Sequence, residues 1–140
     1  MNPANPANPA THALILFAHG SSQVSWRAPF DDIVQRVQML LNAQNENVWV
    51  QLAFLELMQP SIEQAVQSAV RQGIRSIRIV PLFFGVGKHV ADDLQVIIQS
   101  VQSEHADVLI ELAPALGQSE WMRQAMAEYA VQNLGSSAFP

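Results

Sequence analysis

The sequence predicts an α/β domain in which a parallel sheet carries helices on both faces. Apolar runs of strand length alternate with longer segments whose apolar residues recur at helical spacing, and four such strand–helix pairs follow one another. Strict alternation favours crossover connections, which build a parallel sheet. At 140 residues the chain has the length of one domain with its own core.

The first two pairs carry the clearest local signals. A strand is expected over 13–18, where A-L-I-L-F-A is continuously apolar, and a second over 48–54. The helix between them has Pro29 near its first turn. Its apolar stripe consists of Phe30, Ile33, Val34, Val37 and Leu41. The second helix starts at Ser61, and Gln64 three residues later completes a capping box.

The last two pairs follow the same pattern. Gly73 ends the second helix, and strands are expected over 77–84 and within 107–113. The stripe of the third helix consists of Val90, Leu94, Ile97, Ile98 and Val101. Ser119 caps the last helix, which ends near Gly135 and has a stripe of Met122, Ala125, Met126 and Tyr129. Core packing is expected for four methionines, Met39, Met58, Met122 and Met126.

The domain is expected to occupy residues 12–135, between two tails. Residues 1–11 contain a triple Asn-Pro-Ala repeat, and residues 136–140 form a short C-terminal tail. Proline at every third position prevents both helix and strand pairing, so the first tail is predicted to be extended or rich in turns.

Composition narrows the class of protein. Apolar residues make up 49% of the chain and charged residues only 14%, so part of the apolar surface is expected to be covered by a partner, with a homodimer the favoured form. The absence of cysteine excludes disulfides, thiolate metal sites and a cysteine nucleophile. A net charge of −5 argues against nucleic-acid binding. No segment has the apolar length of a membrane span or the pattern of a secretion signal, so the cytoplasm is the expected location.

Candidate chemistry gathers where the predicted strands end. His19 follows the first strand, Glu56 the second and His89 the third. Ligands of open α/β sheets bind at this edge. Imidazole and carboxylate together suit a borderline divalent metal, although histidines beside strands are also common structural residues. Other chemistry is disfavoured, because the chain has no G-x-S-x-G elbow of a hydrolase, and its 85–89 segment lacks the Ser or Thr of a phosphate-binding loop.

Three strings carry a family resemblance. L-F-A-H-G-S-S at 16–22, L-A-F-L-E-L-M-Q-P at 52–60 and P-L-F-F-G-V-G-K-H-V-A-D-D-L at 81–94 resemble the CbiX/SirB chelatases, and more narrowly the short single-domain CbiX proteins. W-R-A-P-F at 26–30 and P-A-L-G at 114–117 support the match. The resemblance runs from about residue 12 to the last helix.

The resemblance implies a chelatase that inserts a divalent metal into sirohydrochlorin, in cobalamin or related tetrapyrrole biosynthesis. It implies a three-layer, doubly wound sheet with strand order 2-1-3-4, and a homodimer for short forms. Co²⁺ is the expected metal substrate, with Fe²⁺ and Ni²⁺ as alternatives, and no organic cofactor is expected. His19 and His89 are implied as the pair that handles the metal and accepts protons, with Glu56 as the acidic residue beside them.

The substrate contacts are less fixed by the resemblance. Many relatives carry Arg where this chain has Ser22, so a cation for the carboxylates of sirohydrochlorin is missing there. Candidate substrate-binding residues in the three loops are Ser21, Arg27, Gly85, Gly87 and Lys88, among which Arg27 and Lys88 are the replacement cations. The alternative function is a carrier that binds metal or tetrapyrrole without turnover.

Overall fold

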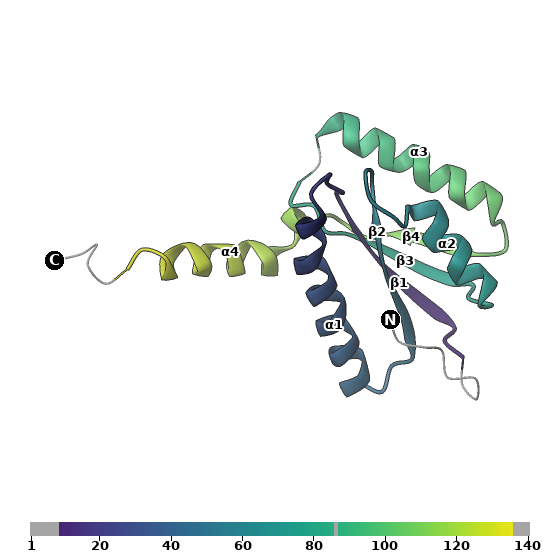
Figure 1. Cartoon of the computed structure of the whole chain (residues 1–140), viewed down its shortest axis with the longest axis horizontal. Helices are drawn as coiled ribbons and strands as arrows, with labels where there is room; N and C mark the ends of the chain where they lie inside the picture. Colours follow the sequence, from purple (N-terminus) through teal and green to yellow (C-terminus); the bar gives the residue numbers. More distant parts are fainter. Residues whose placement is uncertain (1–8, 86, 136–140) are drawn as a thin grey trace.

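The sheet has the topology that the resemblance implies. The computed structural model describes residues 9–85 and 87–135, apart from the side chain of residue 89. Four parallel strands lie in the order β2-β1-β3-β4 (Figure 1). They are β1 (His12–Ala18), β2 (Val48–Phe54), β3 (Ser76–Pro81) and β4 (Leu109–Leu112). All three pairings are parallel, which confirms the predicted class and strand order.

Helices cover both faces of the sheet, but unequally. One face carries α2 and α3, and the other carries α1 (Figure 1). The helix α4 follows the last strand and runs away from the sheet (Figure 1). The helices are α1 (Ala28–Ala43), α2 (Ile62–Arg71), α3 (Lys88–Glu104) and α4 (Glu120–Gln132), and the short 3₁₀ turns are η1 (Val24–Arg27) and η2 (Leu116–Gln118).

The central strand β1 is buried on both sides, which explains its uninterrupted apolar sequence. Ile15 and Phe17 belong to the core cluster under α2 and α3. Leu16 and Ala18 belong to the cluster under α1. Because successive side chains of a strand point to opposite faces, a strand between two helical layers must be apolar at every position.

The local helix signals are confirmed. The Ser61 hydroxyl accepts from the Gln64 backbone N–H at 3.2 Å, and the Gln64 side chain accepts from the Ser61 N–H at 2.9 Å. Gly73 has φ +86° directly beyond the second helix, a conformation that favours glycine. The Ser119 hydroxyl accepts from the Met122 N–H at 3.3 Å and caps α4.

Two expectations were wrong, one about the end of a strand and one about packing. The third strand was expected to reach residue 84, but it ends at Pro81. Its pairing with β1 ends at the Phe17–Pro81 pair, and its pairing with β4 ends at the Ile79–Leu112 pair. Met39 and Met126 are not core residues, since they are 70% and 46% exposed. Met39 lies off the apolar stripe of α1, and Met126 belongs to a helix that packs on no face of its own sheet.

The described structure includes the end of the predicted N-terminal tail. Ala10, inside the predicted tail, is buried in the larger core cluster next to the start of β1. The rest of the Asn-Pro-Ala repeat before residue 9, and the tail at 136–140, lie outside the described residues. In the described part of the chain, no helix combines the length and the apolar character needed to cross a bilayer.

Candidate metal and tetrapyrrole site

The loops that follow the four strands meet at one edge of the sheet. Backbone hydrogen bonds join neighbouring segments of this edge. They run from Leu55 N–H to Ala18 O at 2.9 Å, from Leu82 N–H to Phe17 O at 2.7 Å, and from Leu116 N–H to Phe83 O at 3.0 Å. The predicted site residues lie on these loops or next to them. The edge is therefore a continuous surface built from segments far apart in the sequence, as expected for a parallel sheet.

His19 is exposed but held in a fixed position. Its ring packs against the ring of Phe83, with 4.3 Å between centroids and 41° between planes. Phe83 is buried and packs in turn on Phe17, with centroids 5.4 Å apart. The Trp26 indole Nε1–H donates to the His19 carbonyl oxygen at 2.8 Å. One face of the imidazole is thus supported by an aromatic ring while the side chain stays accessible to a ligand.

Glu56 lies on a tight turn beside the first loop. The Met58 N–H donates to the Glu56 carbonyl oxygen at 2.8 Å, and Leu57 between them has φ +65°, the geometry of a γ-turn. The Glu56 side chain is exposed and has no ion pair or hydrogen bond to another described residue. A Cβ at Gly20 would lie 1.6 Å from the Glu56 carbonyl oxygen. Only glycine allows the two loops to approach this closely.

The third loop leaves open space around its glycines. A Cβ added at Gly85 or Gly87 would meet nothing in the described structure within 4 Å. Gly87 is the N-cap of α3 and offers no side chain to the free N–H groups of the first turn. The backbone of His89 lies in this turn, and its side chain lies outside the described residues. The predicted approach of His19 and His89 therefore stays a prediction.

The two candidate cations differ in their surroundings. The Arg27 guanidinium donates to the Gln59 carbonyl oxygen at 2.8 Å, pairs with Asp31 at 3.3 Å, and lies 5.3 Å from the centroid of the Phe54 ring. Lys88 is exposed and has no ion pair or hydrogen bond within the described structure. Arg27 is thus already engaged in joining α1 to the second loop, whereas Lys88 is available to an anion.

The serines of the first loop are exposed or half-buried. The Ser21 hydroxyl accepts from the Gln23 N–H at 3.1 Å and shapes the loop. Ser22 is exposed and supplies no charge to the first loop. Among the residues that the structure describes, no three His, Asp or Glu side chains cluster as a ready metal-binding group.

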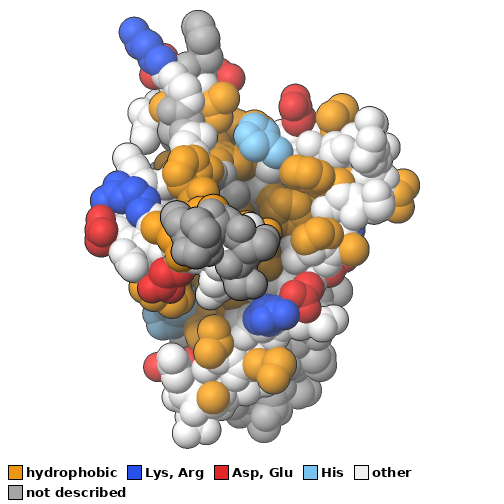
Figure 2. All heavy atoms as spheres, turned by 90° about the vertical axis from the view of Figure 1, so that its left-hand side faces the viewer, with side chains coloured by type: hydrophobic (Ala, Val, Ile, Leu, Met, Phe, Trp, Pro, Cys, Tyr) orange, Lys and Arg blue, Asp and Glu red, His pale blue; other side chains and the backbone are white. Residues whose placement is uncertain are grey.

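Exposed apolar side chains are a further feature of the edge, and those of Trp26 and Leu57 were not expected from the sequence. Trp26, Leu57 and Phe84 are 43%, 71% and 56% exposed. Figure 2 shows hydrophobic side chains gathered, with a histidine among them, on the side from which α4 projects. Trp26, Leu57 and Phe84 each lie in one of the strings that carry the family resemblance. Their exposure depends on the conformation of the loops, which the sequence alone does not give. Such a surface suits a flat apolar ligand.

Comparison with known proteins agrees with this reading of the fold. The strand order and the surrounding helices define an α/β domain of the CbiX/SirB chelatase type. Residues 13–133 match the CbiX family model, and the chain belongs to the CbiX family. A crystal structure described as a cobalamin (vitamin B12) biosynthesis CbiX protein of Marinobacter aquaeolei has a TM-score of 0.74 and 31% identity, covering 88% of this chain and 97% of that one.

Two relatives carry activity names that differ in the metal. The sirohydrochlorin cobaltochelatase of Methanocaldococcus jannaschii is 29% identical over 94 residues, which is 66% of this chain and 62% of the relative. The sirohydrochlorin ferrochelatase of Bacillus subtilis is 32% identical over 76 residues, which is 54% of this chain and 29% of the relative. The matched regions thus span less than two thirds of each of these relatives.

Proposed function

We propose that this protein is a chelatase that inserts a divalent metal into sirohydrochlorin. The observation that carries the proposal is the exposed His19 ring, supported by Phe83 and lying on a loop packed against Glu56, at an edge with exposed apolar side chains. The family membership and the relatives named after sirohydrochlorin support the same chemistry.

The proposed reaction replaces two pyrrole N–H protons by the metal ion, so two protons must leave for each ion inserted. Neutral imidazole binds borderline divalent metals and also accepts protons near neutral pH. His19 and His89 are the proposed metal-handling and proton-accepting pair. Glu56, with its carboxylate free of described partners, is proposed to relay protons or to orient a histidine.

The ring of the substrate is proposed to lie on the apolar part of the edge. Leu57 and Phe84 offer exposed apolar surface there, and the open space at Gly85 and Gly87 admits close approach of a ligand to the backbone. Lys88 is the proposed partner of a substrate carboxylate. Ser21 and Arg27 are proposed as further contacts, with Arg27 acting mainly by holding the loops together.

Several finer points belong to the proposal as well. Co²⁺ is the favoured metal substrate, and Fe²⁺ and Ni²⁺ are the alternatives. The names of the relatives support Co²⁺ and Fe²⁺. A place in cobalamin biosynthesis and a homodimeric state are proposed alongside. A cytoplasmic location and the absence of an organic cofactor stay predictions from the sequence.

The test is an anaerobic absorbance assay with sirohydrochlorin and Co²⁺, Fe²⁺ or Ni²⁺ in turn. A chelatase changes the spectrum at catalytic protein concentrations, and the relative rates rank the metals. Substitution of His19 or His89 by Ala should abolish the gain over the uncatalysed reaction. Saturation at one equivalent of protein, with no gain in rate, would contradict turnover and support the carrier alternative.

A further inference from the structure

The His19 peptide lies directly beyond the sheet, where a side chain takes the place of a neighbouring strand as its hydrogen-bond partner. The final carbonyl of β1, that of Ala18, still accepts a backbone bond from the Leu55 N–H at 2.9 Å. The next carbonyl, that of His19, accepts from the Trp26 indole Nε1–H at 2.8 Å. This bond fixes the His19 peptide plane, and with it the direction in which the imidazole leaves the backbone.

The Trp26 ring is itself held from the opposite side. It packs on the Phe30 ring, with 5.5 Å between centroids and 51° between planes. Phe30 packs in turn edge-on against the buried Phe54 ring, with centroids 6.4 Å apart. The Trp26 backbone N–H donates to the Gln23 carbonyl oxygen at 3.1 Å within the turn η1. The indole therefore links the His19 peptide to α1 and β2.

Two contacts thus hold His19 by different atoms. The Trp26 bond acts on the carbonyl oxygen, whereas Phe83 packs against the imidazole ring. A fixed peptide with a free ring, or a fixed ring plane on a free peptide, would still leave the imidazole several positions. Both constraints together reduce the entropy that His19 loses when it binds a ligand.

The indole also offers a surface of its own to a ligand. Trp26 is 43% exposed, and Val24 in the same turn is 89% exposed. Because a tetrapyrrole is much wider than an imidazole, a macrocycle centred near His19 extends over the groups bonded to the His19 backbone. The Trp26 ring is such a group, and aromatic side chains supply a large apolar contact area.

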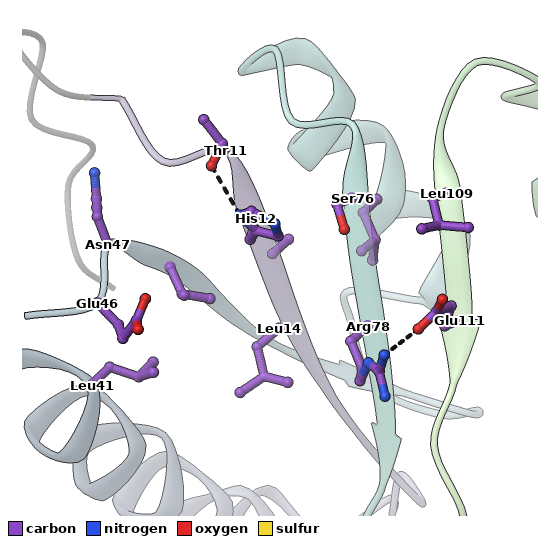
Figure 3. Close-up of a pocket in the computed structure, with 13 residues that line it drawn as sticks. Thr11, His12, Leu14, Leu41, Glu46, Asn47, Ser76, Arg78, Leu109 and Glu111 are labelled. Atoms are coloured by element: carbon purple, nitrogen blue, oxygen red, sulfur yellow. Dashed lines mark hydrogen bonds and ion pairs between the residues drawn. The ribbon is translucent and has the colours of Figure 1, made fainter. Parts of the chain in front are cut away.

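The charges of the chain make an ionic contact at this loop unavailable. Residues 19–26 contain no Lys, Arg, Asp or Glu. The Arg27 guanidinium, which follows them, is directed to the second loop by its bond to the Gln59 carbonyl oxygen. Figure 3 shows Arg78 paired with Glu111 at the opposite edge of the sheet, in a hollow of about 680 Å³ beside the first residues of the strands. The first loop therefore meets a ligand through neutral groups.

We infer that Trp26 is a positioning residue for His19 and that its exposed indole ring contacts the tetrapyrrole. The inference rests on the proposed chelatase function and extends it to the first loop. The ligand covers the indole ring, and the N–H of the same ring fixes the peptide of the proposed metal-handling histidine. Trp26 thus supplies an apolar contact in a loop that has no cation for the substrate carboxylates.

The first test measures the positioning role without any activity. Trp26→Phe keeps an aromatic ring but removes the indole N–H donor. The Gly20 amide nitrogen is bonded to the His19 carbonyl carbon, so its NMR chemical shift responds to hydrogen bonding at that carbonyl. The Gly20 nitrogen signal should move upfield in Trp26→Phe. The matched control is Trp49→Phe, because Trp49 is buried in β2 and makes no described contact with His19. An unchanged Gly20 signal in Trp26→Phe would overturn the positioning role.

The second test separates the two roles by kinetics of metal insertion. Trp26→Phe should lower kcat about fivefold with little change in KM, because the donor is lost and the ring is kept. Trp26→Ala should lower kcat similarly and raise KM for sirohydrochlorin about tenfold, because the ring contact is lost as well. Trp49→Phe should lower stability without lowering kcat. Circular dichroism checks that each variant is folded.

The third test measures binding of metal-free sirohydrochlorin by absorbance titration, which does not depend on turnover. Trp26→Ala should raise Kd about tenfold, whereas Trp26→Phe should change it little. Equal Kd values for Trp26→Ala and the unsubstituted protein would overturn the ring contact. An unsubstituted protein that binds sirohydrochlorin but inserts no metal would instead contradict the chelatase proposal, while the Gly20 signal and the Kd values would still decide both roles of Trp26.

Discussion

The His19 ring packs in a tilted arrangement against the buried Phe83 ring, with 4.3 Å between centroids and 41° between planes. This contact joins the end of β1 to the loop after β3, and the Phe83 ring packs in turn on the Phe17 ring. An exposed histidine would otherwise sample several rotamers, at a cost in entropy when it binds a ligand. Phe83 is therefore expected to act as a positioning residue for His19.

Phe83→Leu is predicted to lower kcat about tenfold, because the imidazole loses the surface that fixes its ring plane. The free energy of unfolding should fall by about 1 to 2 kcal/mol, as is usual for a reduced core side chain. Steady-state metal insertion and urea denaturation measure the two effects. Because the substrate contacts stay in place, KM should change less than kcat.

The matched control is Phe17→Leu. Phe17 is fully buried and contacts the Phe83 ring, but no ring contact joins it to His19 in the described structure. It should cost similar stability with a smaller loss of kcat. Equal losses of kcat in the two variants would contradict a specific positioning role and indicate a general effect of core damage.

Gly20→Ala is predicted to be strongly destabilising. The added Cβ would lie 1.6 Å from the Glu56 carbonyl oxygen and 3.2 Å from the Met58 nitrogen, both of them backbone atoms that cannot rotate away. Overpacking of this kind costs about 1 to 3 kcal/mol, and it separates the loops of His19 and Glu56. Urea denaturation should show the loss of stability. An unchanged midpoint would mean that the two loops tolerate greater separation than the structure indicates.

The two candidate cations are predicted to have different roles, Lys88 in substrate binding and Arg27 in the stability of the fold. Lys88→Ala should raise KM for sirohydrochlorin about two- to fivefold, with a smaller effect at high salt, because an exposed charge is screened. The unfolding free energy of this variant should stay within about 0.5 kcal/mol of that of the unsubstituted protein.

Arg27→Ala should instead cost about 1 to 2 kcal/mol of stability, since it removes the hydrogen bond to Gln59 and the stacking on Phe54. The reverse assignment would show Arg27 to be the cation that meets the substrate.

Most of the fold could be predicted because its signals are local. The capping pair Ser61 and Gln64, the glycine at 73 and the apolar run of β1 each depend on a few neighbouring residues. The exposure of α4 could not be predicted this way. Its stripe has the spacing of a packed helix, but in the structure every residue of α4 except the half-buried Met122 is exposed.

The site shows the same division. The topology alone brings His19 and Glu56 to one edge, so their neighbourhood follows from strand order. The stacking on Phe83 and the role of Arg27 as a link between loops depend on side-chain geometry across separate segments. No spacing rule in a single sequence encodes such contacts.

Gly85→Ala is predicted to leave stability nearly unchanged and to impair the reaction. No described atom lies within 4 Å of the added Cβ, and the backbone there does not have a positive φ, so neither packing nor conformation requires glycine in the free protein. If the segment approaches the tetrapyrrole, the methyl group should raise KM several-fold while the urea midpoint stays constant. Gly20→Ala is the contrasting variant, because its main expected effect is a loss of stability. Unchanged KM and kcat in Gly85→Ala would place the ring away from this loop.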